Sequence, residues 1–213
     1  MRIKVCGITS LEDAEAAQRL GAWAIGLNHH PESPRFVAPD VAAEIGAALK
    51  RRCEVAGVFV NAPLDEISQA AEEIGFTHVQ LHGDEGPAFC AEAARRTGCK
   101  VIKALRIRSS ADVRAAKAFR TDYHLLDAYH PGRPGGTGES FDWELTARHG
   151  AVIPMILAGG LRPENVSDAI AATHPFAVDV ASGVEAEPGR KDHERLEAFF
   201  ESANAATPTG SAR

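Results

Sequence analysis

A cysteine and an aspartate each stand at the end of a short apolar run, where their side chains could do acid–base chemistry. Cys6 follows Ile-Lys-Val, and Asp127 follows Tyr-His-Leu-Leu. Because side chains alternate along a strand, Lys4 and Cys6 would share one face. A nearby cation lowers the pKa of a thiol and supplies a thiolate that can act as a base or a nucleophile. A buried inert cysteine and a helix-capping aspartate are the alternatives, and residue type alone leaves both open.

Two glycine-rich segments could bind a phosphate group. Gly159 and Gly160 follow one apolar run and precede a predicted helix, and Ser182 and Gly183 follow the last apolar run. Backbone N–H groups without bulky side chains can surround phosphate oxygens, and a helix N-terminus adds positive potential. Each segment alone is more typical of a tight turn. Together, after neighbouring strands, they favour a phosphate site.

Two further charged residues are candidates for the same site. Arg35 lies in a loop that Pro31 and Pro34 stiffen, so its guanidinium could be held ready for a carboxylate or a phosphate. An exposed surface arginine is the commoner alternative. Asp179 lies between valines in the last apolar run. We expect it to line the substrate site and to organise the groups around it.

Nine histidines are present, but their spacing does not indicate a metal site. His29 and His30 would face opposite sides of a strand, and no HxH or HExxH pattern occurs. The glycine-rich loop over residues 131–138 lacks the Lys-Ser/Thr of a P-loop, so we interpret it as a mobile lid. We therefore expect no catalytic metal.

The elements that must position these residues alternate along the chain. Short apolar runs alternate with Ala-rich, charged segments, which predicts parallel strands joined by helices. The turn after the first run has no GxGxxG, which argues against a doubly wound sheet. The predicted strands cover residues 3–5, 22–27, 55–60, 77–81, 100–105, 123–127, 153–157 and 177–180.

Polar or potentially catalytic residues end or follow all of these runs, as is typical of a closed (β/α)8 barrel. They are Cys6, Asn28, Asn61, His82, Arg106, Asp127, Gly159 and Ser182. We predict an α/β protein of the TIM-barrel class with a single domain over residues 1–204. Residues 205–213 are rich in Thr, Gly, Pro and Ser and are predicted to be a flexible tail.

Composition excludes several classes of partner. The 213 residues carry a formal net charge of −6, which argues against a nucleic-acid or anionic-membrane binder. No apolar run reaches the ~20 residues of a membrane span, and the first residues do not resemble a signal peptide. The four cysteines form no CxxC, so we expect reduced thiols and a cytoplasmic protein. This composition does not exclude a small anionic molecule bound at a local site, and the expected assembly is a monomer or a homodimer.

Taken together, the motifs resemble the phosphoribosylanthranilate isomerase family. The resemblance runs from residue 3 to about residue 200, and its segments follow in the family's order. They include Lys-Val-Cys-Gly-Ile-Thr, Ser-Pro-Arg, Gln-Leu-His-Gly-Asp-Glu and Val-Asp-Val-Ala-Ser-Gly-Val-Glu. The matching segments are residues 4–9, 33–35, 57–61, 79–85, 126–128, 135–138, 157–161 and 178–185.

The resemblance implies a (β/α)8 barrel without a cofactor that acts in tryptophan biosynthesis. The implied reaction is the Amadori rearrangement of N-(5-phosphoribosyl)anthranilate to 1-(2-carboxyphenylamino)-1-deoxyribulose 5-phosphate. Matching the family's motifs makes Cys6 the general base and Asp127 the general acid. The same matching places Arg35 opposite the anthranilate carboxylate.

Two positions depart from the family pattern. Residues 26–30 read Gly-Leu-Asn-His-His where the family usually has Gly-Phe-x-Phe, and Ala181 stands where a serine is common. The alternative functions are a related phosphosugar barrel isomerase and a sugar-phosphate-binding barrel without activity. The first normally has an aspartate at the place of Cys6. The second would need the glycine-rich loops but not both Cys6 and Asp127.

Overall fold

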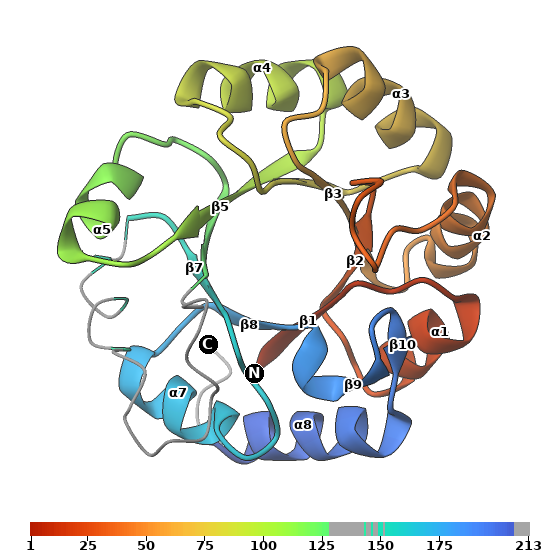
Figure 1. The fold of residues 1–213 in the computed structure, drawn as a ribbon, viewed down its shortest axis with the longest axis vertical. Helices are drawn as coiled ribbons and strands as arrows, with labels where there is room; N and C mark the ends of the chain where they lie inside the picture. The colour runs from red at the N-terminus through yellow and green to blue at the C-terminus, as the bar shows by residue number, and fades with distance from the viewer. Residues whose placement is uncertain (128–142, 144–145, 147–148, 151, 207–213) are drawn as a thin grey trace.

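Eight parallel strands close into a barrel with helices around the outside (Figure 1). The computed structural model describes residues 1–127, 143, 146, 149–150 and 152–206. Each strand pairs with the next in the chain, and β8 pairs with β1, which confirms the predicted TIM barrel. The strands are β1 (Arg2–Cys6), β2 (Ala24–Asn28), β3 (Glu54–Phe59), β4 (His78–Leu81), β5 (Lys100–Arg106), β6 (Tyr123–Asp127), β7 (Met155–Ala158) and β8 (Ala177–Val180).

The helices follow the strands as the alternation predicts. They are α1 (Leu11–Arg19), α2 (Pro39–Leu49), α3 (Leu64–Ile74), α4 (Pro87–Thr97), α5 (Ser110–Ala116), α7 (Val166–Thr173) and α8 (His193–Ala205). The helix that the alternation predicts between β6 and β7 lies mostly outside the described residues. The predicted lid over residues 131–138 and residues 207–213 of the predicted tail also lie outside them. Helix α8 ends at Ala205, one residue beyond the predicted end of the domain.

Local signals in the sequence explain where several helices begin and end. Ser10 caps α1, because its hydroxyl accepts a hydrogen bond from the Asp13 N–H at 3.2 Å. Helix α3 buries Ile67, Ala71 and Ile74 along one face, and it ends at Gly75 in a left-handed conformation with φ 78°. These helix ends return the chain to the strands, so that each strand's carboxyl end emerges on the same side of the barrel.

Aromatic side chains close the amino end of the barrel. Trp23, His78, Tyr123 and Phe176 lie at or just before the starts of the even-numbered strands. Trp23 contacts each of the other three rings edge-on, with centroids 5.5–5.6 Å apart. This packing fills the barrel interior at that end, and the space for a ligand lies at the carboxyl ends of the strands.

A short hairpin after β8 is an element that the sequence analysis did not predict. A 3-10 turn, η1 (Ser182–Val184), leads into the antiparallel strands β9 (Glu185–Glu187) and β10 (Arg190–Lys191). Figure 1 shows this hairpin between β1 and the helices α1 and α8. The hairpin therefore lies against the part of the barrel that contains Cys6. Within the described residues, no helix is long and apolar enough to cross a membrane.

Candidate active site

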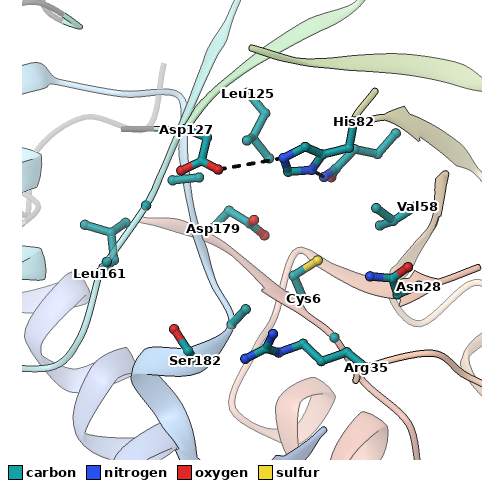
Figure 2. Close-up of a pocket in the computed structure, with 16 residues that line it drawn as sticks. Cys6, Asn28, Arg35, Val58, His82, Leu125, Asp127, Leu161, Asp179 and Ser182 are labelled. Carbon is teal, nitrogen blue, oxygen red and sulfur yellow. Dashed lines mark hydrogen bonds and ion pairs between the residues drawn. The ribbon is translucent and has the colours of Figure 1, made fainter. Parts of the chain in front are cut away.

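A cavity of about 500 Å³ opens at the carboxyl ends of the strands. Cys6, Asp127, Arg35, Asp179 and Ser182 point into or line it, as Figure 2 shows. Gly159 and Gly160 also line it, so the structure brings together seven of the eight predicted site residues. The complete lining is Cys6, Gly7, Asn28, Arg35, Val58, Gln80, His82, Leu125, Asp127, Ala158, Gly159, Gly160, Leu161, Asp179, Ala181 and Ser182.

Gly183, the eighth predicted residue, does not line the cavity. A Cβ at this position would collide with the backbone carbonyl oxygen of Leu161. The close approach of the chain after β8 to the chain after β7 therefore requires a glycine here. Gly183 brings the two predicted phosphate-binding segments together, and Ser182 is the member of the pair that faces the cavity.

The barrel interior next to Cys6 contains a buried ion pair. Lys4 is fully buried, and its Nζ lies 2.8 Å from Asp179 Oδ1 on the neighbouring strand β8. Gly26 on β2 leaves room for both Lys4 and Cys6, since a Cβ there would lie 2.7 Å from Cys6 Sγ and 3.0 Å from Lys4 Nζ. Burial lowers the pKa of Lys4, but Asp179 and Cys6 outweigh burial and raise it. Lys4 therefore stays charged beside the thiol.

The pKa of the Cys6 thiol differs from the sequence-based expectation. Burial raises this pKa, Lys4 lowers it, and the charge of Asp179 raises it again. The net result is a pKa above the ordinary value, whereas the cation alone predicted a lowered one. The prediction considered Lys4 without the desolvation of the thiol or the nearby carboxylate, and these two effects exceed the attraction to Lys4.

Asp127 faces the cavity from the end of β6 and pairs with a histidine. His82, which directly follows β4, places its Nε2 3.7 Å from Asp127 Oδ2. Its Nδ1 lies 3.2 Å from Gln80 Nε2. Figure 2 shows the Cys6 thiol and the Asp127 carboxylate on either side of Asp179. A proton donor and a proton acceptor can thus act on one ligand held between them.

Arg35 is held at the edge of the cavity by Glu185. Its Nε and Nη2 donate hydrogen bonds of 2.8 and 2.6 Å to the two carboxylate oxygens. Gly7, with φ 71°, lies under the arginine, and a Cβ there would come within 2.5 Å of Arg35 Cδ. The arginine is therefore not a freely moving surface residue, which was the commoner alternative. Its remaining N–H groups are available for a ligand anion.

Gly159 and Gly160 form a tight turn where β7 ends. Their φ values are 96° and 66°, which only glycine adopts without strain. No atom lies within 4 Å of the place where a Cβ of Gly160 would be. Asn165 fixes the turn, because its side chain accepts a hydrogen bond from Arg162 N and donates one to Gly160 O. A phosphate could approach this turn closely, next to the start of α7.

Sequence reasoning named His82 as a strand-end residue but missed its pairing with Asp127. The same reasoning missed Glu185 and Lys191, which pair with each other across the hairpin at 2.9 Å. Strand-end position was a signal for His82. The sequence of the hairpin contained no signal for Glu185 and Lys191, because its strands are too short to show an alternating pattern. Within the described residues, no group of three potential metal-ligating side chains occurs.

A closed barrel with a thiol, a carboxyl group and a glycine turn at the start of a helix around one cavity is typical of a phosphosugar enzyme that uses acid–base chemistry. The sequence profile of the family described as N-(5'-phosphoribosyl)anthranilate isomerase matches residues 3–202. The chain belongs to this family and is an isomerase, which confirms the resemblance found in the sequence.

Individual relatives agree with the family profile over nearly the whole chain. The N-(5'-phosphoribosyl)anthranilate isomerase of Geobacter metallireducens is 45% identical over 205 residues, which cover 96% of this chain and 100% of the relative. The crystal structure of the Thermotoga maritima isomerase is 40% identical with a TM-score of 0.88, covering 96% and 99% of the two chains. A structure of the isomerase in complex with reduced 1-(o-carboxyphenylamino)-1-deoxyribulose 5-phosphate is 37% identical, with a TM-score of 0.84 and coverage of 96% and 99%.

Proposed function

We propose that the chain converts N-(5-phosphoribosyl)anthranilate into 1-(2-carboxyphenylamino)-1-deoxyribulose 5-phosphate, the expected step of tryptophan biosynthesis, with Cys6 as general base and Asp127 as general acid. The observation that carries this proposal is that Cys6 from β1 and Asp127 from β6 line one cavity. Membership of the isomerase family favours this function over the two alternatives. An Asp-based phosphosugar isomerase would need a carboxylate at position 6, where this chain has a thiol.

The reaction requires one proton donor and one proton acceptor. Asp127 protonates the ring oxygen of the ribose, and the amine nitrogen supplies the electron pair that opens the ring to a Schiff base. The Cys6 thiolate then removes the C2′ proton and gives an enolamine. The enolamine takes up a proton at C1′ and loses the hydroxyl proton at C2′, which yields the ketone. Protons are exchanged, but no atom is gained or lost overall.

The two charged ends of the substrate fit different parts of the cavity. We assign the anthranilate carboxylate to Arg35 and the phosphate to the turn formed by Gly159 and Gly160 together with Ser182. Gly183 supports this phosphate site by its close packing. The relative that binds a reduced carboxyphenylamino-deoxyribulose phosphate supports a ligand with the same two anionic ends. Asp179 would act through Lys4 and Cys6, to which it is coupled.

We propose that the protein is a cytoplasmic enzyme without a nucleic-acid or membrane partner. The negative net charge supports the absence of a nucleic-acid partner. The proposed assembly is a monomer or a homodimer. Monomers derived from the dimeric Thermotoga maritima isomerase form a solved structure that is 37% identical, with a TM-score of 0.82 and coverage of 96% and 99%. Both states therefore occur among the relatives of this chain.

The activity is tested by following the fluorescence of freshly prepared phosphoribosylanthranilate after the purified protein is added in the presence of EDTA. We expect a rapid decay that depends on protein concentration and yields the ketose product. Binding of the substrate without turnover would instead indicate the sugar-phosphate-binding barrel. Turnover of another phosphosugar in preference to this substrate would indicate the related isomerase.

A further inference from the structure

One buried carboxylate connects Arg35 with a lysine of the β9–β10 hairpin. Glu185 receives the two hydrogen bonds from Arg35 and a third, of 2.9 Å, from Lys191 Nζ. The Glu185 side chain is 4% exposed, and the Lys191 side chain is fully buried. We call these three residues, Arg35, Glu185 and Lys191, the Glu185 cluster.

Lys191 extends the Glu185 cluster to the base and to the phosphate side of the cavity. Its ammonium group donates a hydrogen bond of 2.7 Å to the Cys6 carbonyl oxygen and one of 3.3 Å to the Ala181 carbonyl oxygen. Cys6 ends β1, and Ala181 directly follows β8. One buried ammonium group therefore connects the strand end of the base, the segment before Ser182, and the carboxylate that holds Arg35.

The charges in the Glu185 cluster depend on one another. One carboxylate lies between two cations, so removal of the carboxylate would leave Arg35 and Lys191 facing each other without a counterion. Burial raises the pKa of Glu185, but Arg35 and Lys191 outweigh this and lower it, so Glu185 stays charged. Removing one partner of a buried ion pair is costly, because it leaves an uncompensated charge. Arg35 would then turn toward solvent.

We propose that Glu185 is a positioning residue that fixes the Arg35 guanidinium for the ligand carboxylate. Lys191, which binds both Glu185 and the Cys6 carbonyl oxygen, keeps Glu185 and Arg35 at a fixed position relative to Cys6. Glu185 thereby determines specificity for carboxylate-bearing substrates without touching the ligand. This inference rests on the proposed role of Arg35. The alternative is that the Glu185 cluster only stabilises the hairpin, in which case its loss would affect all ligands equally.

The experiment compares two ligands that differ only in the carboxylate. One is reduced 1-(o-carboxyphenylamino)-1-deoxyribulose 5-phosphate, and the other is its phenylamino analogue without the carboxyl group. The ratio of their dissociation constants, measured by isothermal titration calorimetry, is the carboxylate preference. We expect a preference of about tenfold or more in the unmodified protein, because one charge-assisted hydrogen-bonded pair changes a dissociation constant by about this factor. We expect a ratio near one in Arg35→Ala.

Glu185→Gln is the decisive variant, and Glu187→Gln is its matched control on the same hairpin. Glu187 pairs with Arg190 at 2.8 Å, but both side chains are more than 60% exposed. Glu185→Gln is expected to reduce the carboxylate preference by at least about fivefold, while Glu187→Gln leaves it unchanged. Glu185→Gln/Lys191→Met also removes the fully buried ammonium group and leaves only the partly exposed Arg35 cation, so thermal stability should partly recover while the preference stays low.

The outcomes separate this inference from the proposed function. If Arg35→Ala keeps the full preference, Arg35 is not the carboxylate partner and both fail. If Arg35→Ala loses the preference but Glu185→Gln keeps it, only the role of Glu185 is overturned. Equal weakening of both ligands by Glu185→Gln, or a recovered preference in the double variant, also overturns it. If Glu185→Gln alone does not fold, the carboxylate preference of Glu185→Gln/Lys191→Met decides whether Glu185 positions Arg35.

Discussion

Lys4 on β1 and Asp179 on β8 form a 2.8 Å ion pair inside the barrel, two residues before Cys6 along β1. The two residues have opposite effects on the thiol. The charge of Lys4 lowers the pKa of Cys6, and the charge of Asp179 raises it, while burial raises it most. The ionisation of the Cys6 thiol, which the proposed mechanism requires, is therefore sensitive to the charge of either partner of this buried pair.

The first prediction concerns the pH at which Cys6 reacts. Iodoacetamide alkylates the thiolate, so in the free protein the alkylation of Cys6 should have its midpoint above 9.0, the ordinary value from which burial raises this pKa. Lys4→Met removes the cation and should move the midpoint further up. Asp179→Asn removes the anion and should move it down. Peptide-resolved mass spectrometry measures each cysteine separately.

Cys53 is the internal control for this experiment. Burial raises the pKa of Cys53 to about 11, and neither Lys4 nor Asp179 contributes to it. Its alkylation midpoint should therefore be the same in all three proteins. Shifts of Cys6 in the opposite directions would show that the pair does not control the thiol as described.

The second prediction concerns Asp127. Asp127→Asn keeps the shape of the side chain but removes the proton that, in the proposed mechanism, opens the ribose ring. It should lower kcat by about 10²–10⁴-fold with little change in KM, the usual contribution of a positioned acid. Steady-state kinetics on phosphoribosylanthranilate measure this. Asp84→Asn, on the exposed loop after β4, is the matched control and should retain full activity. A near-normal kcat in Asp127→Asn would assign the acid to another residue.

The third prediction concerns the phosphate site. Gly160→Ala should raise KM and weaken competition by inorganic phosphate, because the new methyl group would enter the open space beside the turn. The left-handed φ adds a cost of roughly 1–2 kcal/mol in stability. Gly75→Ala has the same open space and a similar φ of 78°, but it lies at the end of α3. Gly75→Ala should therefore lose about as much stability as Gly160→Ala but should have an unchanged KM. Equal KM values for the two variants would place the phosphate elsewhere.

The fourth prediction concerns metal ions. Both proposed proton-transfer groups are side chains of this chain, so activity should survive exhaustive chelation. The measurement is the rate of fluorescence decay before and after dialysis against EDTA. Loss of activity that zinc or manganese restores would show that the reaction depends on a metal.

The alternation of the sequence was enough to predict where the catalytic candidates meet. Cys6, Asp127 and Gly159 come from distant parts of the chain, but each closes an apolar run, and parallel strands bring such ends together. Period-two alternation also placed Lys4 and Cys6 on the same side of β1. Polar residues at strand ends can be recognised locally in the sequence, and a closed barrel places these strand ends close together.

Contacts made by side chains from irregular segments could not be predicted in this way. The pairing of Arg35 with Glu185 spans 150 residues and depends on a hairpin whose strands have three and two residues. The sequence analysis expected Arg35 to face the ligand and did not predict its pairing with Glu185. The pKa of Cys6 likewise depends on burial, which the residue types around it do not reveal. Gly183 was predicted to contact phosphate because a tight packing requirement and a binding turn both select glycine.

The role of Cys6 as the base is the central claim, and single-turnover kinetics of Cys6→Ala test it most directly. Phosphoribosylanthranilate is mixed with excess enzyme, and its fluorescence decay is compared with that of the unmodified protein and of Cys53→Ala. We predict that Cys6→Ala binds substrate within a few fold of normal affinity but loses at least about 10²-fold in rate. Cys53→Ala should turn over normally. A Cys6→Ala variant that binds substrate and turns it over at the unmodified rate would contradict the account.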